Sequence, residues 1–268
     1  MNKPAISILL PTRGRTEQLK RSVCSLINTA ADASAIEWRL AFDSDDGASY
    51  EYFVAHVLPE IAQSGGQYTV MEFPPIGYAR LHEYVNALAR GAQGDWFVFW
   101  NDDAVMIDSN WDQVIASYTG RFCLQAFATH NMHPYSIFPI VPRQWFEVIG
   151  HLSRHQLNDA WLSQIAWMLD IMQRIDIRVD HERADLTGKN DDATYRNRVI
   201  YEGNLNDPRD FNHVENRKIR SQEAQLISQY LESQGVDITH WKEVSEGKRD
   251  PWAKMMASDI NGQMARQA

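Results

Sequence analysis

Residues 96–100, from Trp96 to Trp100, contain no polar side chain, and they run directly into Asn101, Asp102 and Asp103. A short, wholly apolar run of aromatic and β-branched residues predicts a strand that is buried on both faces of a sheet. Strands of this kind are typical of parallel sheets whose two faces are covered by helices. The abrupt change to three polar residues predicts that the strand ends at solvent or at a ligand cleft.

Further apolar runs precede this strand, and helical patterns separate them. Strands are predicted over residues 5–10, 38–42 and 68–73, and helices over residues 16–27, 49–63 and 79–92. Pro11 is expected to end the first strand, and Thr16 is expected to cap the helix that follows. This alternation predicts an α/β fold with an open, mostly parallel, doubly wound (Rossmann-like) sheet.

The second half of the chain continues the pattern less regularly. Strands are predicted over 122–127, 136–141 and 175–179, helices over 144–149, 158–172 and 221–234, and a long polar loop over 184–216. We expect a main domain over residues 1–182, with a first half over 1–104 and a second half over 105–182. Residues 183–268 are expected to form a loop and a C-terminal helical extension.

Polar clusters follow three of the predicted strands at the point where each strand ends. They are residues 12–15, 43–46 and 101–103. The carboxyl ends of parallel strands meet at one edge of a sheet, and ligands bind in the crevice beyond that edge. The sequence therefore predicts that all three clusters face one cleft.

Charge and cysteine content exclude several classes of protein. The formal net charge is −9, whereas a protein whose whole surface binds nucleic acid or anionic lipid is usually basic. The two cysteines, Cys24 and Cys123, form neither a disulfide framework nor a metal-ligand spacing. No apolar run approaches the roughly 18 residues needed to cross a bilayer. These features favour a cytoplasmic protein without a membrane partner.

Four motifs occur in an order and spacing that resemble the family-two glycosyltransferases, which have the GT-A fold. The similarity covers about residues 5–182, and it implies a nucleotide-sugar half (1–104) and an acceptor half (105–182). The motifs are the strand and basic turn from Ile8 to Arg15, Phe42-Asp43 with acidic residues after it, Trp100 to Asp103 at a strand end, and Asn158-Asp159 after Val148 to Gly150. The third is similar to the family's metal-binding Asp-x-Asp, with Asn101 in its first position.

The resemblance implies a nucleotide-sugar donor, most simply a UDP-sugar. It implies that Thr12, Arg13 and Arg15 line the nucleotide pocket, together with Asp102. Asp43 would accept a hydrogen bond from the N3–H of a uracil, since a carboxylate is an acceptor and the imide is a donor. Arg80 would lie near the diphosphate. A turn cap is the alternative role for Asp43, and a solvated side chain is the alternative for Arg80.

The same resemblance implies a divalent cation, Mn²⁺ or Mg²⁺, held by Asn101, Asp103 and His181. These ions prefer oxygen ligands, usually one or two carboxylates completed by substrate phosphates. A cation bridging two phosphates neutralises the charge of the leaving group. An ordinary acidic turn after a strand is the alternative for residues 101–103.

Asp159 is the implied general base, which would take a proton from the acceptor as it attacks the sugar. Attack from the face opposite the diphosphate would make the enzyme inverting. The alternative is that Asn158 and Asp159 are a helix N-cap without a catalytic role.

Two other functions are compatible with the fold. A nucleotidyltransferase that makes a sugar nucleotide usually has a Gly-rich first loop with a lysine, whereas the loop here has only Gly14. A non-catalytic nucleotide-sugar-binding module is suggested only by Asn101. The acceptor of a transferase would be soluble: a glycan, a protein, a small molecule, or a modified nucleic-acid base such as that of hydroxymethylated phage DNA. The oligomeric state is not indicated by the sequence.

Overall fold

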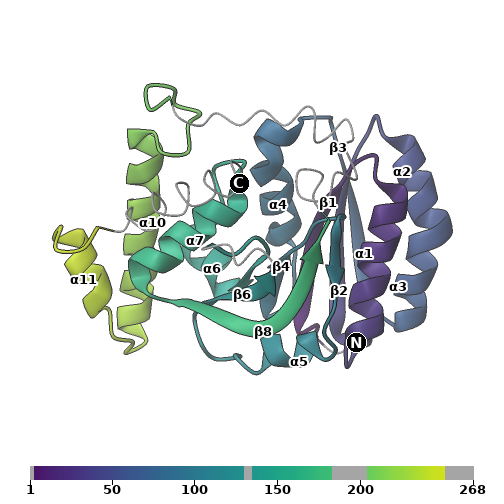
Figure 1. Ribbon diagram of the computed structural model, residues 1–268, viewed down its shortest axis with the longest axis horizontal. Coiled ribbons are helices and arrows are strands. Elements are labelled where there is room, and N and C mark those ends of the chain that lie inside the picture. The colour runs from purple at the N-terminus through teal and green to yellow at the C-terminus, as the bar shows by residue number, and fades with distance from the viewer. Residues whose placement is uncertain (1–2, 130–134, 183–203, 251–268) are drawn as a thin grey trace, which may run out of the picture.

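The computed structural model describes residues 3–129, 135–182 and 204–250. These residues form one eight-stranded sheet with helices on both faces (Figure 1). Helices α1, α2 and α3 lie on one face, and α4, α6 and α7 lie on the other. The predicted α/β class, with helices flanking an open sheet, is therefore confirmed.

The sheet has the strand order β3-β2-β1-β4-β7-β6-β8-β5. In that order the strands are Gln67–Phe73, Ile36–Asp43, Ile6–Thr12, Trp96–Phe99, Pro139–Pro142, Leu124–Thr129, Met172–His181 and Ala104–Met106. Strand β7 is antiparallel to both of its neighbours, and β5 is antiparallel to β8, while the other pairs are parallel. Six of the eight strands therefore point the same way, which confirms the mostly parallel sheet.

The helices are listed here in chain order. They are α1 (Thr16–Thr29), α2 (Gly47–Tyr52), a π-helical turn η2 (Phe53–Val57), α3 (Leu58–Ser64), α4 (Leu81–Arg90), α5 (Trp111–Ala116), α6 (Arg143–Ile149), α7 (Asn158–Leu169), α10 (Val214–Ser233) and α11 (Thr239–Ser245). Short 3₁₀ turns, η1 (Ala33–Ala35) and η3 (Tyr78–Arg80), precede β2 and α4. No helix in the described ranges is long and apolar enough to cross a membrane.

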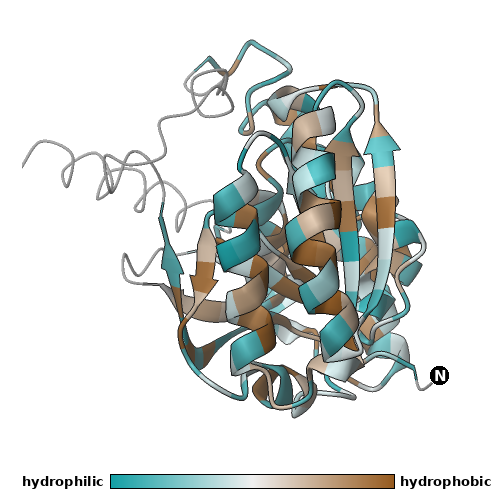
Figure 2. Ribbon diagram, turned by 90° about the vertical axis from the view of Figure 1, so that its right-hand side faces the viewer, coloured by the Kyte–Doolittle hydropathy of each residue, from teal (hydrophilic) through white to brown (hydrophobic). Residues whose placement is uncertain are grey.

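Two hydrophobic cores form because successive side chains of a strand point to opposite faces of the sheet. In β1, Ile8 and Leu10 join the core that α1 covers, and Leu9 joins the core that α4 and α7 cover. Hydrophilic and hydrophobic stretches alternate along the helices in Figure 2, as expected for helices that bury one side. The continuous apolar runs seen in the sequence thus reflect burial on both faces.

The C-terminal helices pack on the same core as α7. Ala224, Ile227 and Leu231 of α10 are buried in the cluster that contains Trp161 and Leu162. The indole N–H of Trp161 also donates a hydrogen bond of 2.7 Å to Glu223 Oε2. The predicted helical extension is thus tightly joined to the acceptor half of the chain.

Strand β1 does not end at Pro11, contrary to the prediction, but continues to Thr12. The carbonyl of Leu9 accepts a bond from Trp100 N–H on the β4 side, and Pro11, two residues later, faces that same side. Strand β4 pairs with β1 only as far as Leu9. A proline without an N–H is tolerated there because no neighbouring strand is present to receive that bond.

Other boundaries also differ from the predictions. Thr16 is the first residue of α1 rather than its cap, and Arg15 occupies the N-cap position. Helix α10 begins at Val214, where the side chain of His213 accepts from Glu215 N–H, and not at Ser221. The short elements β5 and α5 were not predicted. Most of the predicted polar loop, residues 183–203, lies outside the described residues.

Candidate functional site

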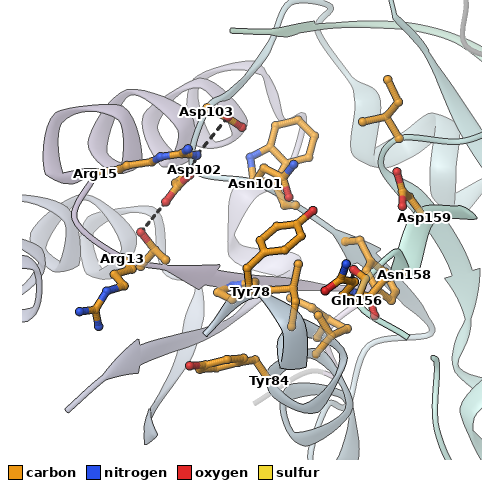
Figure 3. Close-up of a pocket in the computed structure, with 18 of the residues that line it drawn as sticks. Arg13, Arg15, Tyr78, Tyr84, Asn101, Asp102, Asp103, Gln156, Asn158 and Asp159 are labelled. Carbon is orange, nitrogen blue, oxygen red and sulfur yellow. Dashed lines mark hydrogen bonds and ion pairs between the residues drawn. The ribbon is translucent and has the colours of Figure 1, made fainter. Parts of the chain in front are cut away.

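A cavity of about 220 Å³ lies at the carboxyl ends of β1, β2 and β4 (Figure 3). The three polar clusters that follow these strands all contribute to its wall, as predicted from the sequence. The sequence-predicted residues that line it are Thr12, Arg13, Arg15, Asp43, Asn101, Asp102, Asp103, Asp159 and His181. Residues from five strands and helices, up to 169 positions apart in the chain, thus share one cavity, although their individual roles stay predictions.

Arg80 does not line this cavity, although its neighbours Tyr78 and Leu81 do. Its exposed guanidinium pairs with Glu83, at 2.5 Å from Nε and 2.6 Å from Nη2. This pairing raises the pKa of Arg80. A diphosphate would meet Arg80 only if it left Glu83, and such an exposed pair is weak enough to break.

Arg15 lies between two buried carboxylates at the end of β4. Its Nη1 is 2.9 Å from Asp102 Oδ1 and 3.1 Å from Asp103 Oδ2. The second oxygen of Asp102 accepts a 2.7 Å bond from the hydroxyl of Thr12. Burial raises the pKa of Asp102, and the charge of Arg15 only partly offsets it. Asp102 therefore uses both oxygens within the protein, holding Thr12 and Arg15 in place.

Asp103 faces His181, which ends strand β8. Asp103 Oδ1 lies 3.2 Å from His181 Nε2, and it has no hydrogen-bond partner among the described residues. Burial by itself would raise the pKa of Asp103, but contact with His181 and Arg15 lowers it below its ordinary value. Asp103 is therefore a buried carboxylate with one oxygen that faces His181 and accepts no hydrogen bond among the described residues.

These residues fit a divalent cation that is completed by its substrate. Within the described residues, no group of three or more His, Cys, Asp or Glu side chains is arranged to hold a metal ion alone. The donor set that is present consists of Asp103 Oδ1, the imidazole of His181 and the amide of Asn101 beside them. Mg²⁺ and similar ions are commonly bound by one or two carboxylates with the rest supplied by phosphate and water. Asp103 Oδ1, which has no hydrogen-bond partner among the described residues, suits that mode.

Asp43 is held on the other side of the cavity by two partners. The hydroxyl of Tyr84 donates to Oδ1, and Arg13 Nη1 donates to Oδ2 at 2.7 Å. Tyr84 in turn accepts a bond from Ile76 N–H at 3.2 Å, and burial raises its pKa to about 12. Arg13 also pairs with Asp45. These contacts fix the position of a carboxylate that lines the cavity.

The turn after β1 is tied to the turn after β2. Gly14 N–H donates to Asp46 Oδ2 at 2.7 Å and to Ser49 Oγ at 3.0 Å. Gly14 has φ +66°, in the left-handed region that favours glycine. The acidic turn 43–46 therefore orders the basic turn 13–15 as well as contributing Asp43.

Asp159 lies in the first turn of α7, on the wall of the cavity opposite Arg13 and Arg15 (Figure 3). Helix α7 begins at Asn158, and its N-cap is Leu157, whose side chain forms no capping hydrogen bond. Neither Asn158 nor Asp159 therefore occupies the N-cap position. Asp159 faces the same cavity as Asp43 and Asp103.

Tyr78, Tyr84 and Gln156 also line the cavity, and sequence reasoning did not identify them. Tyr84 occupies an apolar position in the helical pattern of α4, beside Val85 and Leu88, where a tyrosine is easily taken for a core residue. The only signal is chemical, because a buried tyrosine hydroxyl needs a hydrogen-bond partner. Its partner, Asp43, is distant in the chain.

Comparison with known proteins shows similarity in structure but not in sequence. No protein-family model matches the chain, and no curated protein matches it. TarS 1–349 from S. aureus, solved with UDP-GlcNAc, superposes with a TM-score of 0.54 and 10% identity over 81% of this chain and 66% of that one. The mannosyltransferase PcManGT from Pyrobaculum calidifontis, solved with GDP-Man and Mn²⁺, superposes with a TM-score of 0.53 and 11% identity. That match covers 97% of this chain and 87% of PcManGT.

A longer TarS structure matches with a TM-score of 0.50 and 9% identity. This match covers 67% of this chain and 37% of that TarS chain. The match to TarS 1–349 solved with UDP covers 60% of that chain. The chain thus spans only part of the TarS chains, whereas it spans most of PcManGT. At such low identities the likeness concerns the fold. The structure of this chain is a GT-A-like glycosyltransferase fold.

Proposed function

We propose that this chain is a metal-dependent, inverting glycosyltransferase that moves a sugar from a nucleotide-sugar to a soluble acceptor. One observation supports this most: Asp43, the Arg15–Asp102–Asp103 cluster and Asp159 line a single cavity at the carboxyl edge of the sheet. The similar structures contain UDP, UDP-GlcNAc, or GDP-Man with Mn²⁺. A nucleotide-sugar is therefore the donor class we assign, with a UDP-sugar as the first candidate.

The nucleotide would lie along the edge formed by β1, β2 and β4. Asp43, held by Tyr84 and Arg13, presents an acceptor to the imide N–H of the base. Thr12 and Arg13 line the pocket beside it. Arg15 is close enough to the end of β4 to place a positive charge beside the diphosphate.

Asn101, Asp103 and His181 would hold Mn²⁺ or Mg²⁺ there. The cation would supply Lewis-acid neutralisation of the charge that develops on the leaving diphosphate. Asp103 contributes a carboxylate oxygen for this purpose that has no hydrogen-bond partner among the described residues. Asp102 keeps Arg15 and Thr12 oriented.

Asp159 would act as the general base. It lies across the cavity from the diphosphate side, so an acceptor beside it approaches the sugar from the face opposite the leaving group. Removal of the acceptor's proton by the carboxylate raises its nucleophilicity during the attack. Attack from that side inverts the configuration of the sugar.

The acceptor is proposed to be a glycan, a protein, a small molecule or a modified nucleic-acid base. The net charge of −9 does not suit a protein that coats nucleic acid. A nucleic-acid acceptor would therefore require a local basic groove. Product formation with such an acceptor would fall steeply with added salt, because phosphate contacts release counterions.

The first experiment is a thermal-shift screen of UDP-, GDP-, dTDP- and CMP-sugars, each with Mn²⁺, with Mg²⁺ and with EDTA. A donor that binds the folded state raises the Tm, and its hydrolysis or transfer is then measured with a radiolabelled sugar. Failure of every sugar nucleotide to bind would contradict the proposal. Pyrophosphate release from a nucleoside triphosphate would favour a nucleotidyltransferase, and nucleotide binding without turnover would favour a binding module.

A further inference from the structure

Gly77 adopts a backbone conformation that other residues avoid. Its φ is +74° and its ψ is 175°, a region that is essentially restricted to glycine. It lies in the segment between β3 and the 3₁₀ turn η3. A Cβ added at Gly77 would meet no atom within 4 Å. Glycine is therefore required here by the backbone and not by a lack of space.

The conformation of Gly77 determines where the next side chain points. Tyr78 is half-buried and lines the cavity. Figure 3 shows its ring below Asn101 and to the left of Asp159, with the hydroxyl pointing toward the space between these two residues. A bend at Gly77 thus carries an aromatic ring from a surface segment into the middle of the candidate site.

The position between Asn101 and Asp159 has a specific chemical meaning if the proposed function is correct. The anomeric carbon of a donor is bonded to the diphosphate on one side and is attacked by the acceptor on the other. The sugar must therefore lie between the Asn101–Asp103 side and the Asp159 side. Tyr78 lines the same cavity, and its hydroxyl points toward that interval.

We propose that Tyr78 binds the transferred sugar and helps to select it, and that Gly77 positions the ring. This inference rests on the proposed function and adds a sugar subsite to it. A tyrosine ring offers an apolar face for the C–H face of a pyranose, and its hydroxyl can donate to and accept from sugar hydroxyls.

The other tyrosine of the cavity is committed elsewhere. The hydroxyl of Tyr84 donates to Asp43, and its ring packs on Phe73 with the centroids 4.8 Å apart. Tyr84 therefore lies on the side of the cavity that we assign to the nucleobase.

The test compares binding of a nucleotide with and without its sugar. Dissociation constants of UDP and UDP-GlcNAc, and of GDP and GDP-mannose, are measured with Mn²⁺ by calorimetry for the wild type, Tyr78→Ala and Tyr78→Phe. The ratio of the two constants in each pair isolates the contribution of the sugar. For Tyr78→Ala we expect the dissociation constant of the sugar nucleotide to rise about tenfold relative to that of the bare nucleotide, which corresponds to about 1.4 kcal/mol. The affinity for the bare nucleotide should stay within about twofold, and Tyr78→Phe should lose less.

Gly77→Ala provides a second variant that leaves the tyrosine intact. It strains the backbone without a steric clash, so it should displace the ring and weaken binding of the sugar nucleotide as Tyr78→Ala does. Gly120→Ala is the matched control: Gly120 has φ +89°, a Cβ there also meets no atom within 4 Å, and Gly120 does not line the cavity. This control should also lose thermal stability, because its φ is positive, and it should keep the wild-type binding ratio.

The two proposals fail in different ways. A wild-type protein that binds no nucleotide at all would overturn the proposed function together with the sugar subsite. A wild-type protein that prefers the sugar nucleotide, with the same preference in folded Tyr78→Ala and Gly77→Ala, would overturn the subsite alone.

Discussion

Arg15 is the single residue on which the charge balance of the candidate site depends most. Its guanidinium and the carboxyl groups of Asp102 and Asp103 are all less than 10% exposed. Arg15 occupies the N-cap position of α1, so the backbone position of this charged residue is also fixed by the start of the helix. A charge network buried to this degree is sensitive to the loss of any one member.

Arg15→Gln should therefore destabilise the fold by about 3–5 kcal/mol, because it leaves two buried carboxylates without their cation. Urea unfolding followed by tryptophan fluorescence measures the loss. Arg13→Gln is the matched control, since its side chain is 41% exposed and Asp43 keeps its bond from Tyr84. That variant should lose less than about 1 kcal/mol, and equal losses in the two variants would contradict this account.

Asp159 is the residue that decides whether the cavity is catalytic. Asp159→Asn keeps the size of the side chain and removes the base, so kcat for transfer should fall by about 100- to 10,000-fold. Binding of the nucleotide-sugar, measured by calorimetry, should not change. Near-normal transfer by this variant would show that another group accepts the proton.

At the scale of elements, the start of α7 is held by a neutral histidine. His155 Nδ1 accepts from Leu157 N–H at 3.1 Å, so its Nε2, 3.0 Å from the carbonyl oxygen of Arg209, is the protonated nitrogen and donates to it. One imidazole thus joins the helix that carries Asp159 to the segment that precedes α10. A proton on Nδ1 would break the bond to Leu157.

Acidification should therefore weaken the fold through His155. Burial lowers the pKa of His155, and the charge of Arg220 lowers it further. The unfolded chain takes up this proton near pH 6.5 and the folded chain only at lower pH, so stability falls as the pH drops from about 6.5 toward the folded pKa. The Tm measured from pH 8 to pH 5 should decline less in His155→Gln than in the wild type. Burial also lowers the pKa of His82 and raises that of Asp102, and these two groups change the stability in opposite directions as the pH falls. The comparison is therefore between the slopes of the two proteins, and an unchanged slope in the variant would contradict the assignment to His155.

At the scale of the whole molecule, the C-terminal helices complete a core that the strands and α7 begin. Arg220 of α10 is fully buried, with its guanidinium 3.9 Å from the ring centroid of Phe211 and 4.9 Å from that of Trp161. Its Nη1 donates to the carbonyl of Phe211 at 2.9 Å. The contact with Trp161 fastens α10 to α7.

A fragment of residues 1–182 should consequently not fold stably. Loss of α10 removes Ile227 and Leu231 from the core, and each fully buried apolar side chain of this size stabilises a fold by about 1.5–3 kcal/mol. Total stabilities of domains are only about 5–15 kcal/mol. Expression of the fragment, with circular dichroism and dye binding as measurements, checks this. A cooperative, soluble fragment would instead support an independent domain that ends at residue 182.

What the sequence by itself determined is the local pattern and its consequence for the fold. Burial periodicity and turn chemistry are local properties, so they predicted the order of strands and helices from β1 to β4 and the polar ends of three strands. Because parallel strands share a carboxyl edge, they also predicted that Asp43, Asp103 and the residues between Thr12 and Arg15 face one cavity. The prediction that Pro11 ends β1 was wrong, because a proline is tolerated in a strand at a point where the neighbouring strand has already ended.

Only the tertiary structure decided how the polar groups pair. Tyr84 and Asp43 are 41 positions apart, and Arg15 and Asp102 are 87 apart. Their contacts depend on strand order and helix docking, which no local pattern encodes. The same holds for His181 beside Asp103 and for Tyr78 inside the cavity. These side chains meet because packing brings distant segments together, and their chemistry follows from burial that exists only in the folded chain.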